Sequence, residues 1–597
     1  MGSAATDVEQ VTWDLEPLVD GKGPRGVDDL LDEADQLADK LADQRGKLAG
    51  FDATTLAVVM DDLATVRDLI TRAGTYAGLL YAADSNAPEH GALVQKVQER
   101  ATATSTKLIF FELEWAALDD AKVEELLADP ALDSCRHYLR MERRYKDHLL
   151  SEPEEKILAE KKVTGRSAWQ RLFDDLISAL EVEIDEQPKT FEEAMSLMSS
   201  PDREIRKQTA QAITDALKPG LKTRSFLFNT ILADKATDDR LRGYPNWIRS
   251  RNLSNEASDE SVQALVDAVI ARYDIPNRWY GLKAKVWGLE KIADYDRIAS
   301  LIDDDETIGW DDAVEMVLSS YASFSPDIAR LAKQFFDDRW IDAPVRPGKR
   351  LGAFCSYATP GLHPYVFLNY THKRRDVATM AHELGHGVHA ALSRPQGIYH
   401  HMTPLTVAET ASVFGETVTV GRMLEQATDP MSRFSLLCAS MERSIATVFR
   451  QIAMNRFEDA VHNARRTEGE LSTERISELW AETQMPMLGD SVEVTENYRS
   501  WWSYIPHFIG SPGYVYAYAY GELLALSVYQ RYLEVGPAFV PKYIEMLSAG
   551  GSMSPEQLGK IVECDLTDPG FWNGGLSIIE RQLDDTEAAA REAGILS

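Results

Sequence analysis

The chain has 597 residues, enough for several domains, and its 44% hydrophobic and 26% charged residues are typical of a globular protein. Its formal net charge is −32, from 63 Lys and Arg against 95 Asp and Glu. Because an acidic surface repels polyanions, we expect neither a nucleic acid nor a membrane as a partner. The first residues lack the basic and apolar segments of a signal peptide, which predicts a cytoplasmic setting.

Helical patterns dominate the chain, so the predicted fold class is mainly α. From Val27 to Gly50, leucines recur at helical spacing among charged residues. Ser151 followed by Glu154 is a capping-box pattern, with Pro153 in the first turn of the helix that follows. No repeat of 20–50 residues is present, which argues against a solenoid. Further helical patterns occupy 203–217, 258–272, 311–321, 431–468 and 520–534.

One segment, Pro364 to Tyr370, is predicted to be a β-strand. It is rich in β-branched and aromatic residues and follows a turn at Pro360-Gly361. Two interpretations are open. The strand could offer an edge with which an extended peptide pairs, or it could be a short buried strand packed under a helix.

A candidate metal-binding motif follows this strand. His382 and His386 are four residues apart, so on a helix both imidazoles leave the same face, one turn apart, as two ligands of one zinc ion require. Glu383 is rotated about 100° from His382, where it can bind a metal-bound water. Asp376 is the predicted N-cap. The helix has an apolar stripe at Val377, Met380, Leu384 and Val388.

A third ligand is predicted on a second helix that begins at Thr403-Pro404. Glu409 and Glu416 lie two turns apart on one face of this helix. A catalytic zinc keeps three protein ligands and one open position, and Glu409 is the favoured third ligand. Glu416 is either the ligand instead or a carboxylate that orients a histidine, and either glutamate could simply be an exposed helix acid. His389 shares the face of the two histidines, where it could shape a pocket or be a buried histidine with its polar atoms satisfied.

At these residues the sequence resembles the M3 family of zinc metallopeptidases, and specifically its oligoendopeptidase F branch. The resemblance is carried by the segment from His382 to His389 and by Val407-Ala-Glu409-Thr-Ala-Ser. It departs from the family in the loop between these segments, which contains His400-His401. Further similar segments are Trp13-Asp-Leu, 150–156, 164–173, 352–356, 505–508 and 514–518.

The resemblance implies a mainly α, two-lobed helical fold that encloses a deep substrate channel, with a small β-element next to the zinc helix. It divides the sequence into an N-terminal helical region (1–115), an oligopeptidase F-type N-terminal helical domain (116–200) and an M3-type zinc peptidase catalytic domain (201–597). One Zn²⁺ is implied as the cofactor, with His382, His386 and Glu409 as its ligands.

The implied activity is hydrolysis of internal bonds of short unfolded peptides, in which a metal-bound water attacks the carbonyl and Glu383 is the general base. His507, Tyr514 and Tyr518 are implied to contact substrate and stabilise the oxyanion. The alternating tyrosines at 514, 516, 518 and 520 predict a strand by pattern, whereas the family implies a loop that turns into a helix, and we prefer the latter. The alternative functions are a zinc metallocarboxypeptidase and an inert helical binding or scaffold protein. Side-chain specificity and oligomeric state are left open by the sequence.

Overall fold

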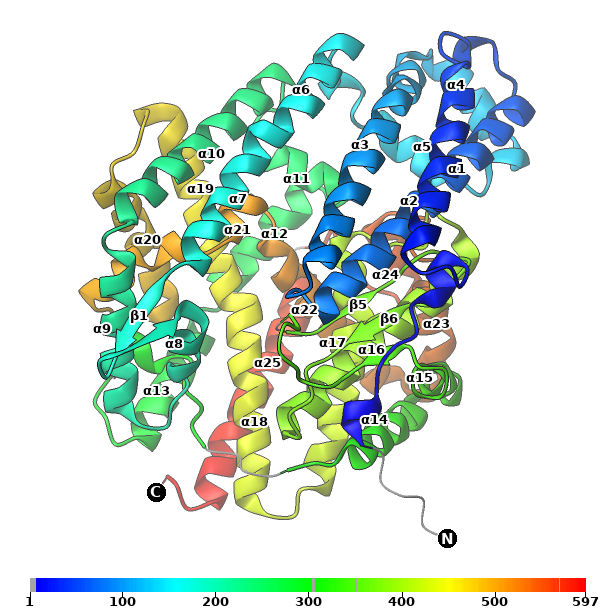
Figure 1. The fold of residues 1–597 in the computed structure, drawn as a ribbon. Helices are drawn as coiled ribbons and strands as arrows, with labels where there is room; N and C mark the ends of the chain where they lie inside the picture. Colours follow the sequence, from blue (N-terminus) through cyan, green and yellow to red (C-terminus); the bar gives the residue numbers. More distant parts are fainter. Residues whose placement is uncertain (1–6, 303–306, 351, 569, 597) are drawn as a thin grey trace. The chain divides into compact units, whose positions relative to one another are not determined.

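The computed structural model describes residues 7–302, 307–350, 352–568 and 570–596 (Figure 1). It consists of two compact units whose segments alternate along the chain. Unit 1 is Met1–Ala159, Asp305–Arg422 and Arg531–Cys564, and unit 2 is Glu160–Asp304, Met423–Gln530 and Asp565–Ser597. Each unit is described by itself. The division of the sequence at 115 and 200 and the substrate channel stay predictions.

Helices account for most of the described residues, so the predicted mainly α fold is confirmed. Unit 1 contains α1 (Pro24–Ala42), α2 (Ala53–Ala83), α3 (Pro88–Ala117), α4 (Asp120–Leu127), α5 (Arg136–Arg143), most of α6 (Glu152–Thr164), α14 (Trp310–Phe324), α15 (Pro326–Asp337), α16 (Arg374–Ser393), most of α17 (Leu405–Gln426), α23 (Val540–Ser548) and α24 (Pro555–Ile561). Its short 3₁₀ helices are Val8–Gln10, Glu16–Val19, Leu48–Gly50, Pro130–Leu132, Lys146–His148, Arg394–Gln396 and Gly536–Phe539.

The helix predicted from Val27 to Gly50 begins earlier and ends earlier than expected. Pro24 occupies its first turn, where a missing N–H costs nothing, and α1 ends at Ala42. The chain then turns at Gly46, whose φ of +78° is the left-handed conformation that glycine adopts readily. Leu48 therefore lies in a separate 3₁₀ turn. Leu30, Leu31 and Leu41 of α1 are buried and Leu37 is partly buried, and the helix packs against α2 and α3, which lie beside it in Figure 1.

A three-stranded sheet lies beside α16 in unit 1. The predicted strand is β6 (Tyr365–Phe367), which is fully buried and runs between β4 (Ile341–Asp342), parallel to it, and β5 (Phe354–Ser356), antiparallel to it. Because β6 has a neighbour on both sides, it has no free edge for a peptide, and the interpretation as a short buried strand is the correct one. Helix α16 packs against β5 and β6, which confirms the small β-element next to this helix (Figure 1).

Unit 2 contains the remaining candidate residues. Its helices are α7 (Arg166–Ser178), α8 (Phe191–Leu197), α9 (Arg203–Leu217), α10 (Leu221–Leu241), α11 (Arg249–Ser254), α12 (Asp259–Ile270), α13 (Asp274–Val286), α18 (Pro430–Ser444), α19 (Arg450–Glu468), α20 (Thr473–Leu488), α21 (His507–Gly510), most of α22 (Tyr516–Val535) and α25 (Phe571–Glu592). A π-helical turn, Ile445–Phe449, joins α18 to α19, and two 3₁₀ helices are Asp294–Asp296 and Glu496–Tyr504.

Two small two-stranded sheets complete unit 2. Strands β1 (Glu181–Ile184) and β2 (Gln187–Thr190) are antiparallel, and β3 (Ile292–Ala293) and β7 (Val492–Glu493) are parallel. The tyrosine-rich segment forms no strand, because a turn leads into α22 at Tyr516, as the family resemblance implied. None of the described helices of either unit has the length and apolar character needed to cross a membrane.

Candidate active site

Helix α16 carries the two predicted histidine ligands. Lys373, and not Asp376 as predicted, is its N-cap, and Asp376 lies in the first turn. The Asp376 carboxylate accepts hydrogen bonds from the backbone N–H groups of Thr371, at 2.7 Å, and Lys373, at 3.2 Å. It therefore satisfies donors at the start of the helix and complements the positive end of the helix dipole.

The apolar stripe of α16 faces the core. Its four members, Val377, Met380, Leu384 and Val388, are all buried. His382 and His386 project from a different face and are only partly buried, with ring centroids 5.1 Å apart. Burial of the stripe fixes the rotation of the helix, and this rotation directs both imidazoles to one side.

Helices α16 and α17 approach each other at Gly385. A Cβ atom on Gly385 would lie 2.4 Å from the carbonyl oxygen of Ala411 and 2.6 Å from the Cα of Ser412, both in α17. No larger residue fits between the two backbones without moving one of them. In α14, the hydroxyl of Tyr321 donates a hydrogen bond to the carbonyl oxygen of Ala381, which ties a third helix to the same crossing.

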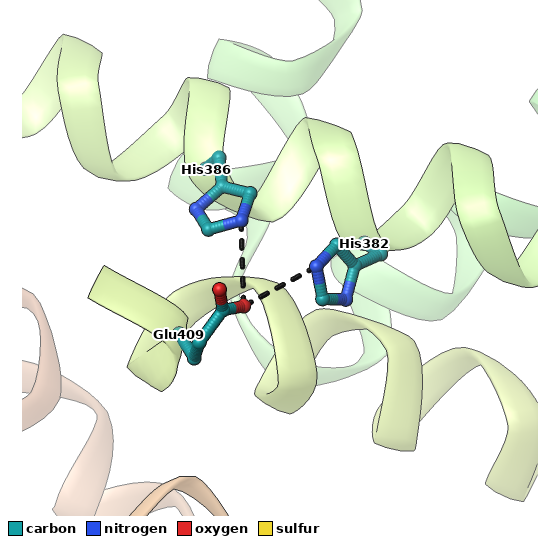
Figure 2. Close-up of side chains that lie close together, drawn as sticks. All are labelled: His382, His386 and Glu409. Carbon is teal, nitrogen blue, oxygen red and sulfur yellow. Dashed lines mark ion pairs between the residues drawn. The ribbon is translucent and has the colours of Figure 1, made fainter. Parts of the chain in front are cut away.

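The crossing brings Glu409 of α17 to the two histidines (Figure 2). The Oε2 atom of Glu409 lies 3.3 Å from Nε2 of His382 and 3.4 Å from Nε2 of His386. One ligand atom of each residue lies within 4.8 Å of the others. Among the residues that the structure describes, this is the one such group of three or more His, Cys, Asp or Glu. Two imidazole nitrogens and one carboxylate oxygen are a donor set that fits a catalytic zinc ion.

Glu416 lies behind His382 and is only 4% exposed. Its Oε2 atom is 3.2 Å from Nδ1 of His382. A carboxylate in this position keeps the proton on Nδ1 and leaves the lone pair of Nε2 free, as is common for histidines that bind a metal. Of the roles left open for Glu416, the geometry supports the orienting one. Glu409 is itself held by Ser412, whose hydroxyl donates a hydrogen bond to Oε2 at 2.7 Å.

The two carboxyl groups at the centre of the site have opposite pKa shifts. Glu383 is 7% exposed, and burial raises its pKa above the ordinary value, although His382 and His386 partly oppose this rise. Burial also acts to raise the pKa of Glu409, but hydrogen bonds with the same two histidines outweigh it and hold that pKa well below the usual range. Glu409 is thus the group suited to stay ionised beside a cation, and Glu383 is the stronger proton acceptor.

Two further residues lie near this group. His389 is 2% exposed, so it is a buried histidine as one of the two interpretations expected, and its Nδ1 atom has no hydrogen-bond partner among the described residues. Burial lowers the pKa of His389 to about 3, which keeps the ring neutral. Its ring centroid lies 6.4 Å from that of Tyr357, a residue that the sequence analysis missed. Burial, followed by the charges of Cys355 and Glu409, raises the pKa of Tyr357 well above its ordinary value. The only sequence signal for Tyr357 is its position directly after the segment 352–356.

The other predicted catalytic residues form a cluster within unit 2. His507 lies at the start of α21, Tyr514 in the turn that follows, and Tyr518 in α22. Nε2 of His507 is 3.2 Å from the hydroxyl of Tyr518, and the ring of Tyr514 is stacked on that of His507 with centroids 6.1 Å apart. Tyr514 and Tyr518 are half-buried, whereas Tyr516 and Tyr520 are fully buried. The structure thus brings together two groups of predicted residues, one in each unit.

Comparison with known proteins defines the class. Residues 196–577 match the profile of peptidase family M3, and residues 114–181 match that of oligopeptidase F. The chain belongs to peptidase family M3, which makes it a peptide hydrolase.

Individual relatives agree with this assignment. The oligopeptidase PepF of Bacillus subtilis is 26% identical over 592 residues, covering 96% of this chain and 87% of the relative. An oligoendopeptidase F homologue of Borreliella burgdorferi is 28% identical over 499 residues, covering 81% of this chain and 83% of the relative. The crystal structure of oligoendopeptidase-F from Enterococcus faecium is similar with a TM-score of 0.73 at 20% identity, covering 95% of this chain and 99% of that one. This likeness shows that the two proteins share a fold.

Proposed function

We propose that this peptidase is a zinc-dependent endopeptidase that hydrolyses internal bonds of short unfolded peptides. The observation that carries the proposal is the convergence of His382, His386 and Glu409, from two crossing helices, on one position in a peptidase of family M3. These three residues would hold a single zinc ion and leave a coordination position open. When bound, zinc supplies Lewis acidity, which makes water more acidic and a carbonyl carbon more electrophilic.

Glu383 is the proposed proton carrier. Its buried carboxylate, with a raised pKa, accepts a proton from the attacking water while the C–O bond to the scissile carbonyl carbon forms. The same carboxyl group then donates this proton to the amide nitrogen as the C–N bond breaks. The products are a free carboxylate and a free amine, so one residue carries the proton through the whole reaction.

Glu416 is proposed to orient His382. A proton held on Nδ1 by the Glu416 carboxylate leaves Nε2 as the electron-pair donor and restricts rotation of the ring. His507, Tyr514 and Tyr518 are proposed to donate hydrogen bonds to the substrate carbonyl oxygen as it gains negative charge. This last role is supported by the family resemblance and by the clustering of the three side chains within unit 2.

The deciding experiment is cleavage of an internally quenched peptide of about ten residues, blocked at both ends, with and without a chelator. We expect cleavage at an internal bond, its loss on metal removal and its return when zinc is added back. Glu383→Gln is the matched control, because it should bind zinc normally and cleave poorly. A folded protein of similar composition should resist cleavage if substrates must be short and unfolded.

The alternative outcomes are distinct. Zinc-dependent removal of single residues from a free C-terminus, with no cleavage of the blocked peptide, would identify a metallocarboxypeptidase. A protein without bound metal and without activity on either peptide would be an inert scaffold.

A further inference from the structure

The main chain of residues 510–514, the turn between α21 and α22, is held by the side chains of two arginines and one glutamate from other elements of unit 2. Arg166, at the start of α7, donates a hydrogen bond from Nη2 to the carbonyl oxygen of Gly510 at 3.4 Å. Arg251 of α11 donates one from Nε to the carbonyl oxygen of Pro512 at 3.3 Å. Both bonds are made to the backbone, so they fix the path of the chain and not the rotamer of one side chain.

A third bond comes from Glu458 of α19. Its Oε1 atom accepts the N–H of Gly513 at 2.8 Å, and its side chain is almost completely buried. Gly513 has a φ of +75°, and a Cβ atom there would lie 2.6 Å from Cδ1 of Ile248 and 3.3 Å from the ring of Trp247. The backbone of the turn is therefore packed directly on side chains that precede α11, where only glycine fits.

The turn connects the three residues proposed to donate to the substrate. His507 precedes it, Tyr514 is its last residue, and Tyr518 is one helical turn further on. Pro512 and Gly513 are buried, whereas the side chains of His507 and Tyr514 are half exposed. The buried centre of the turn thus fixes the positions of the exposed groups on either side of it.

We propose that Arg166, Arg251 and Glu458 are positioning residues that hold the 510–514 turn and thereby set the position of the Tyr514 hydroxyl for catalysis. This inference rests on the proposed function of Tyr514. The physical reason is that Tyr514 follows directly on the residue whose N–H Glu458 accepts, so losing that bond releases the peptide unit next to the tyrosine. Catalytic donors lose their effect when displaced by about 1 Å.

Glu458 is the best residue to substitute, because its uncharged carboxyl group accepts the hydrogen bond from Gly513 and an uncharged side chain can replace it. Burial raises the pKa of Glu458 to about 8, and the Gly513 bond only partly opposes this rise, so the group is mostly protonated at pH 7. A glutamine has nearly the same shape and keeps a carbonyl oxygen for the Gly513 N–H. Glu458→Gln should therefore retain the bond, and Glu458→Leu should remove it at a similar side-chain volume.

The test compares these two variants by kinetics and by hydrogen exchange in the full-length zinc enzyme. For Glu458→Leu we expect kcat to fall about 10- to 100-fold with little change in KM, since the affected donor acts on the transition state. Amide exchange in the segment 508–518 should become about tenfold faster, as expected for one lost hydrogen bond. Glu458→Gln should match the wild type in both measurements, and Arg251→Gln should shift both in the direction of Glu458→Leu.

A double variant tests whether the effect acts through Tyr514. If it does, Tyr514→Phe combined with Glu458→Leu should be no slower than Tyr514→Phe alone. The matched control is Glu442→Leu, which removes another carboxyl group of unit 2, one that is partly buried, but leaves Lys283 bonded to the carbonyl oxygens of Arg297 and Ala299. It should lower the melting temperature without changing kcat or exchange in 508–518.

The results of these experiments distinguish failure of the positioning proposal from failure of the proposed function of Tyr514. Unchanged exchange in 508–518 for Glu458→Leu would overturn the proposal, and so would fully additive losses in the double variant. A wild-type kcat for Tyr514→Phe would instead refute the proposed function of that tyrosine, while hydrogen exchange would still report whether Glu458 holds the turn. If Glu458→Leu does not fold, Arg251→Gln carries the same test, because Arg251 is only half-buried.

Discussion

The close crossing of α16 and α17 at Gly385 predicts that Gly385→Ala lowers both stability and zinc affinity, and the expected losses can be estimated from the distances at the crossing. In Gly385→Ala the new Cβ atom would lie 2.4 Å from the carbonyl oxygen of Ala411, at least 1 Å closer than van der Waals contact allows. Because both contacts are to backbone, no side chain can rotate away, and the two helices must separate by about 1 Å.

This separation has two measurable consequences. Overpacking costs about 1–3 kcal/mol of unfolding free energy, partly offset by about 1 kcal/mol from the better helix propensity of alanine. The helix movement also displaces Glu409 from His382 and His386, and metal sites tolerate ligand shifts of only about 0.2 Å. We therefore expect zinc affinity to fall at least tenfold and kcat/KM about 100-fold.

The assay has three parts, each made on Gly385→Ala and on a control. Unfolding of the metal-free protein by urea gives stability, competition with a chelating dye gives zinc affinity, and the quenched peptide gives kcat/KM. The control is Gly78→Ala in α2, where a Cβ atom meets nothing within 4 Å. It should be stabilised by up to about 1 kcal/mol with unchanged zinc affinity. Wild-type zinc affinity in Gly385→Ala would refute the reasoning that this close approach positions the ligands.

Three further predictions concern single side chains. Glu383→Gln should bind zinc with wild-type affinity and lose kcat about 100- to 10,000-fold, and substantial residual turnover would exclude Glu383 as the base. Glu416→Leu should weaken zinc binding about 10- to 100-fold, because it removes the carboxylate that holds Nδ1 of His382. Competition with a chelating dye measures this affinity, and an unchanged value would exclude an orienting role for Glu416. Burial lowers the pKa of His400 to about 4, so the unfolded chain binds a proton more readily and stability falls as pH drops below about 6.5. Urea unfolding at pH 7 and at pH 5 measures how much stability is lost on acidification, and we expect this loss to be about 2 kcal/mol smaller in His400→Gln than in the wild type. Glutamine is chosen because it can still accept the hydrogen bond from the backbone N–H of Tyr138. An equal loss in both proteins would contradict the lowered pKa of His400.

The sequence was informative where the argument depends on residues close together in the chain. A spacing of four residues and an apolar stripe of helical period were enough to predict that His382 and His386 leave one face of a helix. The need of a catalytic zinc for a third protein ligand selected Glu409 on the next helix, and it lies beside both histidines. It misjudged the N-cap of α16, because the Asp376 carboxylate reaches back to donors before the helix, a contact that spacing alone does not reveal.

A local sequence pattern was ambiguous where tertiary packing decides which side chains are exposed. The tyrosines of 514–520 alternate as they would in a strand, yet they lie in a turn and a helix, and only Tyr514 and Tyr518 are partly exposed. Likewise the composition of β6 indicated a strand, but its two neighbours come from segments before it, so only the assembled sheet shows that it has no free edge.

The sequence by itself determined the mainly helical class, the residue types of the candidate metal site and their local spacing. These properties depend on backbone periodicity and side-chain chemistry, which act over a few residues. Only the tertiary structure decided that Glu416 lies beside Nδ1 of His382, that Gly385 is a point of close backbone contact, and that Glu458 reaches the N–H of Gly513. Each of these contacts joins residues far apart in the chain, and their distances are set by how buried helices pack and cross, which no local pattern encodes.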